Sequence, residues 1–336
     1  MAGDEILAVE GVSKHFTSSV SVTDRLFGTK PSVNRAVDGV DLVLRRGETV
    51  GLVGESGCGK STLARTIVGL YRPDAGTVRY DGAVLPARRS PAQHRAIQMV
   101  FQDPFSSLNP RMTVGQTLGE LLRFHRLVPR NKVPDRCREL MRLVGLPDSA
   151  LNQRPRQFSG GQRQRIGIAR ALAVEPTVLI ADEPVSALDV SVQATIINLL
   201  TELKETLDLS VIFVSHNMAV VRQLSDRTAV MYLGRIVETG VTGSVFDAPV
   251  HPYTRLLLES VPRLGVPATQ VDDAAPSAAS IDVVAGAQPC RYLDRCPVAV
   301  SECGSEPALI PDPADPLRSA ACVHVPWQAR VSEEIG

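Results

Sequence analysis

The stretch GESGCGKST, residues 54–62, matches the pattern G-x-x-x-x-G-K-[ST] and decides how the rest of the chain is interpreted. It lies between the uniformly apolar run TVGLV (49–53), typical of a buried strand, and STLARTIVGL (61–70), which has helical spacing. A strand, a glycine-rich loop and a helix in this order predict a phosphate-binding site, because backbone N–H groups at the start of the helix point at the anion. The alternative is a glycine-rich turn with a chance lysine, which the flanking strand and helix disfavour.

Phosphate oxygens need many hydrogen-bond donors at close range, and the loop supplies them. Its glycines let the backbone curl inward, Lys60 adds a positive charge for the β and γ phosphates, and the hydroxyl of Ser61 completes a Mg²⁺ shell. The predicted nucleotide-binding residues of this stretch are Gly54, Glu55, Ser56, Gly57, Cys58, Gly59, Lys60, Ser61 and Thr62.

Two carboxylates end a second apolar strand, in TVLIADEP (177–184). The carboxyl ends of neighbouring parallel strands meet at the same edge of a sheet, so these side chains are expected to face the same phosphates. Asp182 is predicted to hold Mg²⁺, and Glu183 to polarise the attacking water as a general base. An acidic strand–turn junction without chemistry is the alternative, and the pairing with Lys60 argues against it.

Composition and charge restrict the classes of protein to consider. The 336 residues carry 36 basic and 36 acidic side chains, so no global electric field favours nucleic acid or an anionic membrane. The apolar runs fall far short of the ~20 residues that cross a bilayer, and the N-terminal MAGDEILAVE does not resemble a secretory signal. We expect a soluble cytosolic protein, in whose reducing environment clustered cysteines more often bind metal than form disulfides.

Strands and helices alternate along the chain. Ile6–Phe16 and Ala36–Leu44 show the period-two pattern of antiparallel strands, residues 104–147 are helical and basic, and SVIFVS (210–215) is another buried strand. TAVMYLGRIVETG (228–240) predicts two strands joined at a turn. This alternation predicts an α/β fold with a mostly parallel sheet and helices packed on its faces.

Two further motifs complete a set. FSGGQRQR (158–165) opens a helix and is a second anion site, and VSHN (214–217) places His216 at the end of a strand. With GESGCGKST, the glutamine of MVFQDP (99–104), VLIADEP and SALD (186–189), they make the chain resemble the ATP-binding subunits of ABC transporters over about residues 6–262. The resemblance implies an ABC-type P-loop nucleotide-binding domain with a mostly parallel core sheet, an antiparallel β subdomain and an α-helical subdomain.

The same resemblance implies roles for residues outside the phosphate loop. Gln102 would touch Mg²⁺ and the attacking water, His216 would contact the γ-phosphate, and Phe16 is the best match to the aromatic residue that stacks on adenine. The turn of Ser159, Gly160, Gly161 and Gln162 would bind the γ-phosphate of ATP held by another subunit, and Asp189 would lie in the loop that crosses the dimer interface. Each chain has one phosphate loop and one such turn, so a complete site needs two subunits.

Two longer stretches indicate which branch of the family applies. DPFSSLNPRMTVGQ (103–116) and VFDAPVHPYTRLLLESVP (245–262) resemble the oligopeptide, dipeptide and nickel importers, most closely the second of the two ATPase subunits of such systems. The implied partners are a paralogous ATPase subunit in a heterodimer, two transmembrane permease subunits and, indirectly, an extracytoplasmic substrate-binding protein. The implied place is the cytoplasmic face of the membrane, bound peripherally.

Other functions remain alternatives. An importer of nickel or another small solute fits the same motifs, as does a soluble ABC ATPase acting in DNA repair or iron–sulfur assembly. The span from Lys60 to Ser159 lacks the heptads and paired cysteines of DNA-repair members, and the basic stretch Arg123–Arg142 is better explained as a solvated helical face than as a nucleic-acid site.

Four of the six cysteines, Cys290, Cys296, Cys303 and Cys322, lie in the last fifty residues. Zinc sites more often use C-x₂-C pairs, whereas a cubane cluster needs four thiolates and tolerates irregular spacing. The importer resemblance implies a [4Fe–4S] cluster here, with zinc and metal-free thiols as alternatives. The predicted division is a nucleotide-binding domain (1–262, its helical subdomain about 104–168), a linker (263–289) and a small cysteine-rich C-terminal appendage (290–336).

Overall fold

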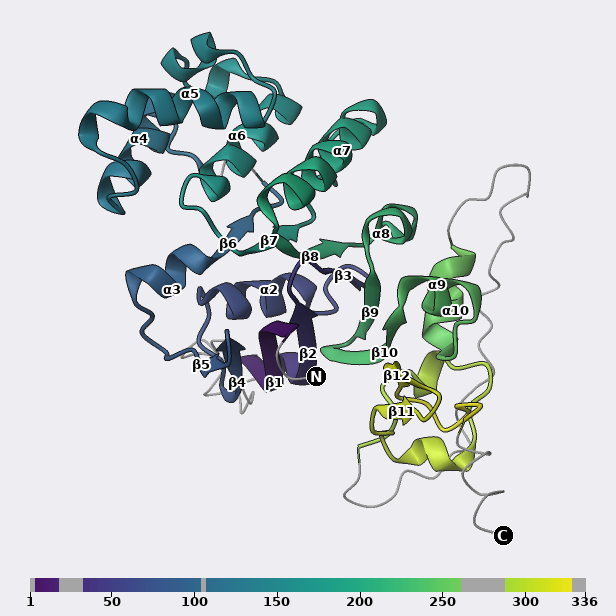
Figure 1. Cartoon of the computed structure of the whole chain (residues 1–336). Coiled ribbons are helices and arrows are strands. Elements are labelled where there is room, and N and C mark those ends of the chain that lie inside the picture. Colours follow the sequence, from purple (N-terminus) through teal and green to yellow (C-terminus); the bar gives the residue numbers. More distant parts are fainter. Residues whose placement is uncertain (1–3, 18–32, 104–106, 261–287, 328–336) are drawn as a thin grey trace, which may run out of the picture.

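The computed structural model describes residues 4–17, 33–103, 107–260 and 288–327 (Figure 1). The strands are β1 Glu5–Thr17, β2 Val33–Arg45, β3 Thr49–Val53, β4 Ala75–Tyr80, β5 Ala83–Val84, β6 Ile97–Val100, β7 Val178–Asp182, β8 Ser210–Ser215, β9 Arg227–Tyr232, β10 Arg235–Val241, β11 Ile310–Asp312 and β12 Asp315–Ala320. The α-helices are α2 Lys60–Val68, α3 Pro91–Ala96, α4 Val114–Phe124, α5 Val133–Leu143, α6 Gly160–Leu172, α7 Val190–Leu207, α8 Met218–Leu224, α9 Thr242–Asp247 and α10 Pro252–Glu259. Short 3-10 helices are η3 Arg130–Lys132, η4 Asp148–Asn152, η5 Pro155–Gln157, η6 Leu293–Arg295 and η7 Ser301–Gly304.

The central sheet has the strand order β11-β12-β10-β9-β3-β8-β7-β6. The five strands from β9 to β6 pair in parallel, which confirms the predicted mostly parallel core. Strands β3, β7 and β8 are buried along their whole length because helices or a second sheet cover both faces of the central sheet. Beyond β9 the pairing turns antiparallel, through β10 and β12 to β11.

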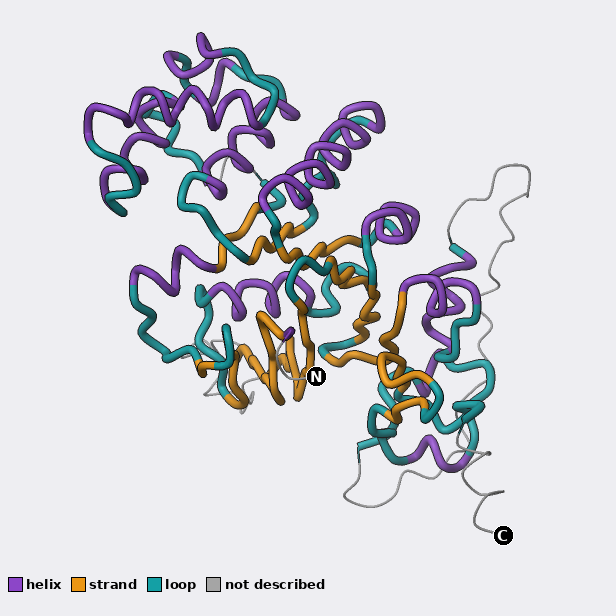
Figure 2. The backbone as a smooth tube through the Cα atoms, in the orientation of Figure 1, coloured by secondary structure: helices purple, strands orange, loops and turns teal. Residues whose placement is uncertain are grey.

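Two hydrophobic cores lie on opposite faces of this sheet. Along β8, Ile212 and Val214 join the core under α2 and the antiparallel sheet, whereas Val211 and Phe213 join the core under the helical subdomain and α7. Successive side chains of a strand point to opposite faces, so one strand serves both cores. The strands in the middle of Figure 2 therefore carry helices on either side.

The predicted antiparallel sheet is confirmed, with the strand order β2-β1-β4-β5. The predicted helical subdomain is also confirmed: α4, α5 and α6 pack on one another through buried residues such as Leu118, Leu122 and Leu140. Arginines of α5 pair with nearby carboxylates at the surface, for example Arg136 with Glu139, in line with a solvated helical face. Among the described residues, no helix is both long and apolar enough to cross a membrane.

The C-terminal segment 288–327 extends the central sheet. Strand β12 pairs with β10 at Glu238 and Thr239, and the side chains of Tyr292 and Cys296 belong to the larger core. Nearly all of the predicted linker lies in residues 261–287, outside the described part of the chain. The predicted boundaries between nucleotide-binding domain, linker and tail stay predictions.

Candidate active site

The phosphate loop connects the end of β3 to the start of α2, and its path leaves no room for side chains at two glycines. Gly59 has φ 112°, and a Cβ there would lie 1.9 Å from the carbonyl oxygen of Ala36. Gly54 has φ 150°, and its Cβ would lie 2.1 Å from the carbonyl oxygen of Met231. Only glycine fits such left-handed backbone at so close an approach.

Lys60 is buried and lies inside the curve of the loop. Its Nζ donates to the carbonyl oxygens of Gly54 at 2.7 Å and Glu55 at 2.8 Å, and lies 3.8 Å from Sγ of Cys58. Burial raises the pKa of the Cys58 thiol. The loop thus concentrates a positive charge and the N–H groups at the start of α2 in one small concave region.

Ser61 and Asp182 meet across the junction of α2 and β7. The Ser61 Oγ donates to Asp182 Oδ1 at 2.8 Å, and the carboxylate is buried. Burial raises the pKa of Asp182, while the hydrogen bond from Ser61 opposes that rise. A hydroxyl and a carboxylate oxygen side by side are the ligand types that Mg²⁺ prefers, so these two residues fit a magnesium site.

Glu183 is the centre of a second group, formed by the three predicted catalytic residues. The Gln102 Nε2 donates to Glu183 Oε2 at 3.0 Å, and His216 Nδ1 lies 3.3 Å from Glu183 Oε1. Gln102 also donates to Ser186 Oγ at 3.2 Å, a contact that the sequence analysis missed. Glu183 has φ 45°, a strained value for a residue other than glycine and one typical of functional sites.

The turn at Ser159 begins α6 and is held by a capping box. The Ser159 Oγ accepts from the N–H of Gln162 at 3.3 Å, and the Gln162 side chain accepts from the N–H of Ser159 at 3.0 Å. Gly161 packs against α7, because a Cβ there would lie 2.4 Å from Val192 Cγ1. Asp189 is exposed at the start of α7. The predicted contact between this turn and a nucleotide on another subunit stays a prediction.

Phe16 lies near the end of β1 with 38% of its surface exposed. Its ring meets that of Tyr71 edge-on, with 5.5 Å between centroids, and Lys14 Nζ lies 5.6 Å from it. Stacking of this ring on adenine stays a prediction.

Two residues that sequence reasoning missed hold the start of the phosphate loop. The Tyr253 hydroxyl accepts the backbone N–H of Glu55 at 2.8 Å, and both terminal nitrogens of Arg295 donate to the Glu55 carboxylate at 3.0 Å. These residues lie 198 and 240 positions from Glu55, so no local pattern points to them.

None of the six cysteines forms a disulfide, and Cys137 is a small buried member of the larger core. Burial is the largest cause that raises the pKa of Cys290 to about 11, and the charges of the other three tail cysteines contribute in the same direction. The backbone N–H of His324 donates to Sγ of Cys322 at 3.5 Å. Within the described residues, however, no three His, Cys, Asp or Glu side chains form a metal-ion site.

Comparison with known proteins gives the family. Residues 37–186 match the protein-family model described as ABC transporter. Residues 237–303 match the family model described as oligopeptide/dipeptide transporter, C-terminal region. The oligopeptide transport ATP-binding protein OppF of Escherichia coli (strain K12) is 45% identical over 311 residues, which is 89% of this chain and 90% of that relative. The chain belongs to the ATP-binding proteins of the oligopeptide/dipeptide group of ABC transporters. It is accordingly an ATPase.

Other relatives agree with this assignment. A probable peptide ABC transporter ATP-binding protein, y4tS of Sinorhizobium fredii (strain NBRC 101917 / NGR234), is 43% identical over 330 residues, covering 95% of this chain and 90% of that protein. Among solved structures, cbiO1 from Clostridium perfringens is 27% identical with a TM-score of 0.60, covering 73% of this chain and 92% of that one. The ATP-binding cassette MJ0796, solved as a dimer bound to ADP and Pi, is 28% identical with a TM-score of 0.60. The match covers 70% of this chain and 99% of that one. The core fold is therefore that of an ABC ATPase.

Proposed function

We propose that this chain is the ATP-hydrolysing subunit of an ABC importer of peptides, either oligopeptides or dipeptides. The observation that carries the proposal is the C-terminal match over residues 237–303, because that region is specific to the oligopeptide/dipeptide group within a large family. The 45% identity to a named oligopeptide transport protein along most of the chain supports it.

The chemistry is transfer of the γ-phosphoryl group to water. Lys60 and the N–H groups of the loop bind the β and γ phosphates, and Glu183 accepts a proton from the attacking water. Gln102 and His216 contact the Glu183 carboxylate from two sides and so orient it and the water. Ser61 and Asp182 would hold Mg²⁺, which when bound would supply positive charge beside the transferred phosphate.

The site is completed by a second subunit in this proposal. The Ser159–Gln162 turn of that subunit supplies donors to the γ-phosphate, and Asp189 lies at the interface between the two. The proposed partners are a paralogous ATPase, two permease subunits and, indirectly, an extracytoplasmic binding protein. Closure of the ATPase pair around ATP would drive the permease rearrangement from the cytoplasmic face of the membrane.

The four tail cysteines are proposed to hold a [4Fe–4S] cluster, with zinc as the alternative metal. The importer resemblance motivates this assignment, and three of the four free thiols are buried. The His324 N–H donates to Cys322 Sγ at 3.5 Å, a contact that stabilises a thiolate ligand, while within the described residues no three of these side chains form a metal-ion site. Such a cluster would cross-link four points of residues 290–322 and supply a redox-active centre there. The small tail on a nucleotide-binding domain would then be a metal-stapled unit.

The proposal is tested with purified full-length protein and with cells. Glu183→Gln should bind ATP but lower kcat by at least about a hundredfold, because the general base is lost, whereas Lys60→Ala should lose ATP binding. Cells lacking the chain should lose uptake of a labelled peptide and regain it with the parent but not with Glu183→Gln. Loss of nickel uptake with normal peptide uptake would overturn the peptide assignment, and DNA-damage sensitivity with normal uptake would overturn transport altogether.

A further inference from the structure

The first residue after the loop's leading glycine, Glu55, is held from two sides by parts of the chain far away in sequence. Tyr253, from the start of α10, is fully buried, and its hydroxyl accepts the backbone N–H of Glu55. Arg295, from the cysteine-bearing segment, donates two hydrogen bonds of 3.0 Å to the Glu55 carboxylate. Tyr253 therefore holds the backbone of Glu55, and Arg295 holds its side chain.

An aromatic cluster connects Tyr253 with Arg295. The rings of Tyr232, Tyr253 and Tyr292 pack with centroids 4.5 to 5.6 Å apart. The Arg295 guanidinium lies 6.0 Å from the centre of the Tyr232 ring and 5.8 Å from that of Tyr292. Tyr292 lies between Cys290 and Arg295 in sequence, so the packing of the cysteine segment sets where the guanidinium sits.

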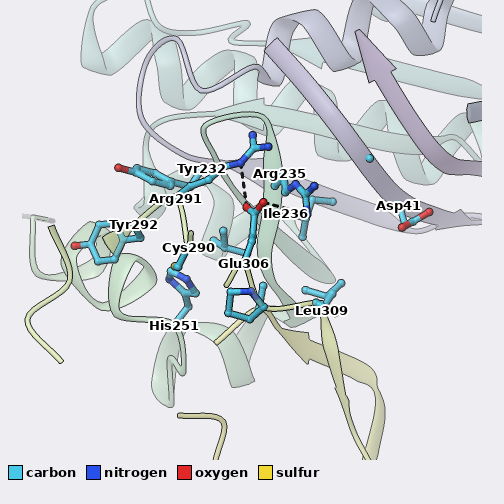
Figure 3. Close-up of a pocket in the computed structure, with 15 residues that line it drawn as sticks. Asp41, Tyr232, Arg235, Ile236, His251, Cys290, Arg291, Tyr292, Glu306 and Leu309 are labelled. Atoms are coloured by element: carbon cyan, nitrogen blue, oxygen red, sulfur yellow. Dashed lines mark ion pairs between the residues drawn. The ribbon is translucent and has the colours of Figure 1, made fainter. Parts of the chain in front are cut away.

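A second bridge runs from the same segment to the far end of the loop. Arg291 donates to the carbonyl oxygen of Leu233, and the next residue, Gly234, donates its N–H to the carbonyl oxygen of Cys58 at 2.8 Å. Figure 3 shows Arg291 directed at Glu306, to which its Nε lies at 3.0 Å, so the arginine is itself held in place. Both ends of the phosphate loop are therefore linked to residues 291–295.

We propose that residues 290–296, with Tyr253, are a positioning device for the phosphate loop, and that they set the affinity for ATP. A loop already held in shape loses less conformational freedom when the nucleotide binds, so the nucleotide binds more tightly. Arg295 also neutralises the Glu55 carboxylate, which would otherwise repel the phosphates. Tyr253 and Arg295 act through Glu55, so they are positioning residues and not catalytic ones. This inference rests on the proposed ATP site at residues 54–62.

The test is the Kd for MgATP, measured by calorimetry on the full-length chain, beside KM and kcat. Arg295→Gln should raise Kd about two- to fivefold, the range expected for an exposed ion pair, since both side chains are more than a third exposed. Tyr253→Phe keeps the ring and removes the hydroxyl, leaving the Glu55 N–H without its acceptor, and should raise Kd about three- to tenfold. In both variants kcat at saturating ATP should stay within about twofold of the parent.

Controls separate positioning from general loosening and from failure of the ATP site. Arg295→Lys keeps the charge but not the two-pronged bond, so its Kd should lie between those of the parent and Arg295→Gln. Arg222→Gln removes an exposed ion pair between α8 and Asp247, outside the proposed positioning device, and should leave Kd unchanged. Equal losses in Arg222→Gln and Arg295→Gln, or a parental Kd in both Arg295→Gln and Tyr253→Phe, would overturn the inference. A parental Kd in Lys60→Ala would instead overturn the proposed ATP site.

Thermodynamic reciprocity supplies a readout that does not depend on turnover. If the segment strengthens ATP binding, ATP must stabilise the segment by the same factor. Hydrogen exchange of the amides of Cys290, Leu293 and Cys296, which are hydrogen-bonded within the tail, should slow about two- to fivefold at saturating ATP in the parent and not in Arg295→Gln. An unchanged exchange rate in the parent would contradict the coupling.

Discussion

At the scale of single residues, the burial of His251 predicts how the folding stability of the chain changes with pH. It is buried, and burial lowers its pKa to about 4, while its Nδ1 accepts the N–H of Tyr253 at 3.1 Å. The unfolded chain titrates near 6.5 and so binds more protons than the folded chain between these values. Stability is therefore fully present above about pH 6.5 and should fall by about 2 kcal/mol from pH 7 to 5 on account of this residue.

The matched variant is His251→Asn, whose short side chain can still accept the Tyr253 N–H but does not titrate. Urea unfolding midpoints at pH 7 and pH 5 should show a smaller drop in the variant than in the parent. Burial raises the pKa of Glu238, which contributes with the opposite sign, but that carboxylate is present in both proteins and largely cancels. Equal drops in the two proteins would show that His251 is not the source.

The proximity of two residues far apart in sequence could be predicted where motif chemistry and strand order point to the same sheet edge. Ser61 and Asp182 lie 121 positions apart, yet the motif pair and the parallel sheet placed them at one edge, where they hydrogen bond. Tyr253 and Arg295 carry no such signal, because a tyrosine after a proline and an arginine between cysteines have many structural uses. Their contact with Glu55 arises only when α10 and the tail dock on β9 and β10.

At the scale of elements, two helices begin with the same device and should respond differently to its loss. Thr113 caps α4 and Ser159 caps α6, each hydroxyl accepting an N–H at 3.2 or 3.3 Å from the glutamine three residues on. Thr113→Ala and Ser159→Ala should each cost about 1 kcal/mol of stability. Only Ser159→Ala should also lower ATPase activity, by at least about tenfold, because its hydroxyl is proposed to contact nucleotide.

Comparison of Thr113→Ala with Ser159→Ala distinguishes a capping role of Ser159 from a role in nucleotide binding. Midpoints of urea unfolding report the shared loss of a cap, and ATPase rates of the assembled transporter report the second role. If both variants lose activity in proportion to stability, the Ser159 turn is only a helix start.

The apolar strands were predictable because uniform burial leaves an unmistakable pattern, as in β3 and β8. Strands β11 and β12 were not predicted, because IPD and DPLRSA are short, polar and proline-containing and have no alternation. Their extended conformation depends on the pairing of β12 with β10 and of β11 with β12, a tertiary effect that a local sequence window does not contain.

At the scale of the whole molecule, the tail is integral to the sheet as well as linked to the loop. Arg318 on β12 lies 4.0 Å from the buried Glu238 carboxylate on β10, which also accepts the N–H groups of Val250 and His251. The sequence alone suggested an appendage after a linker, since composition shows where a chain changes character but not which strand a distant segment will pair with.

Truncation tests whether the tail is an integral part of the sheet or a separate appendage. A chain ending at residue 260 would lose β12, leaving the edge of β10 open and Glu238 buried without its cation, while Tyr253 would lose its packing partner Tyr292. We expect Tm to fall by about 5 °C or more and the protein to aggregate on concentration, because an unpaired strand edge and exposed aromatic rings promote association. A chain ending at residue 327 keeps every strand described here and serves as the control. Parental Tm and solubility in the shorter chain would mean that the tail contributes nothing to the sheet, and the coupling of residues 290–296 to the phosphate loop would then have to be a local contact between separately stable parts.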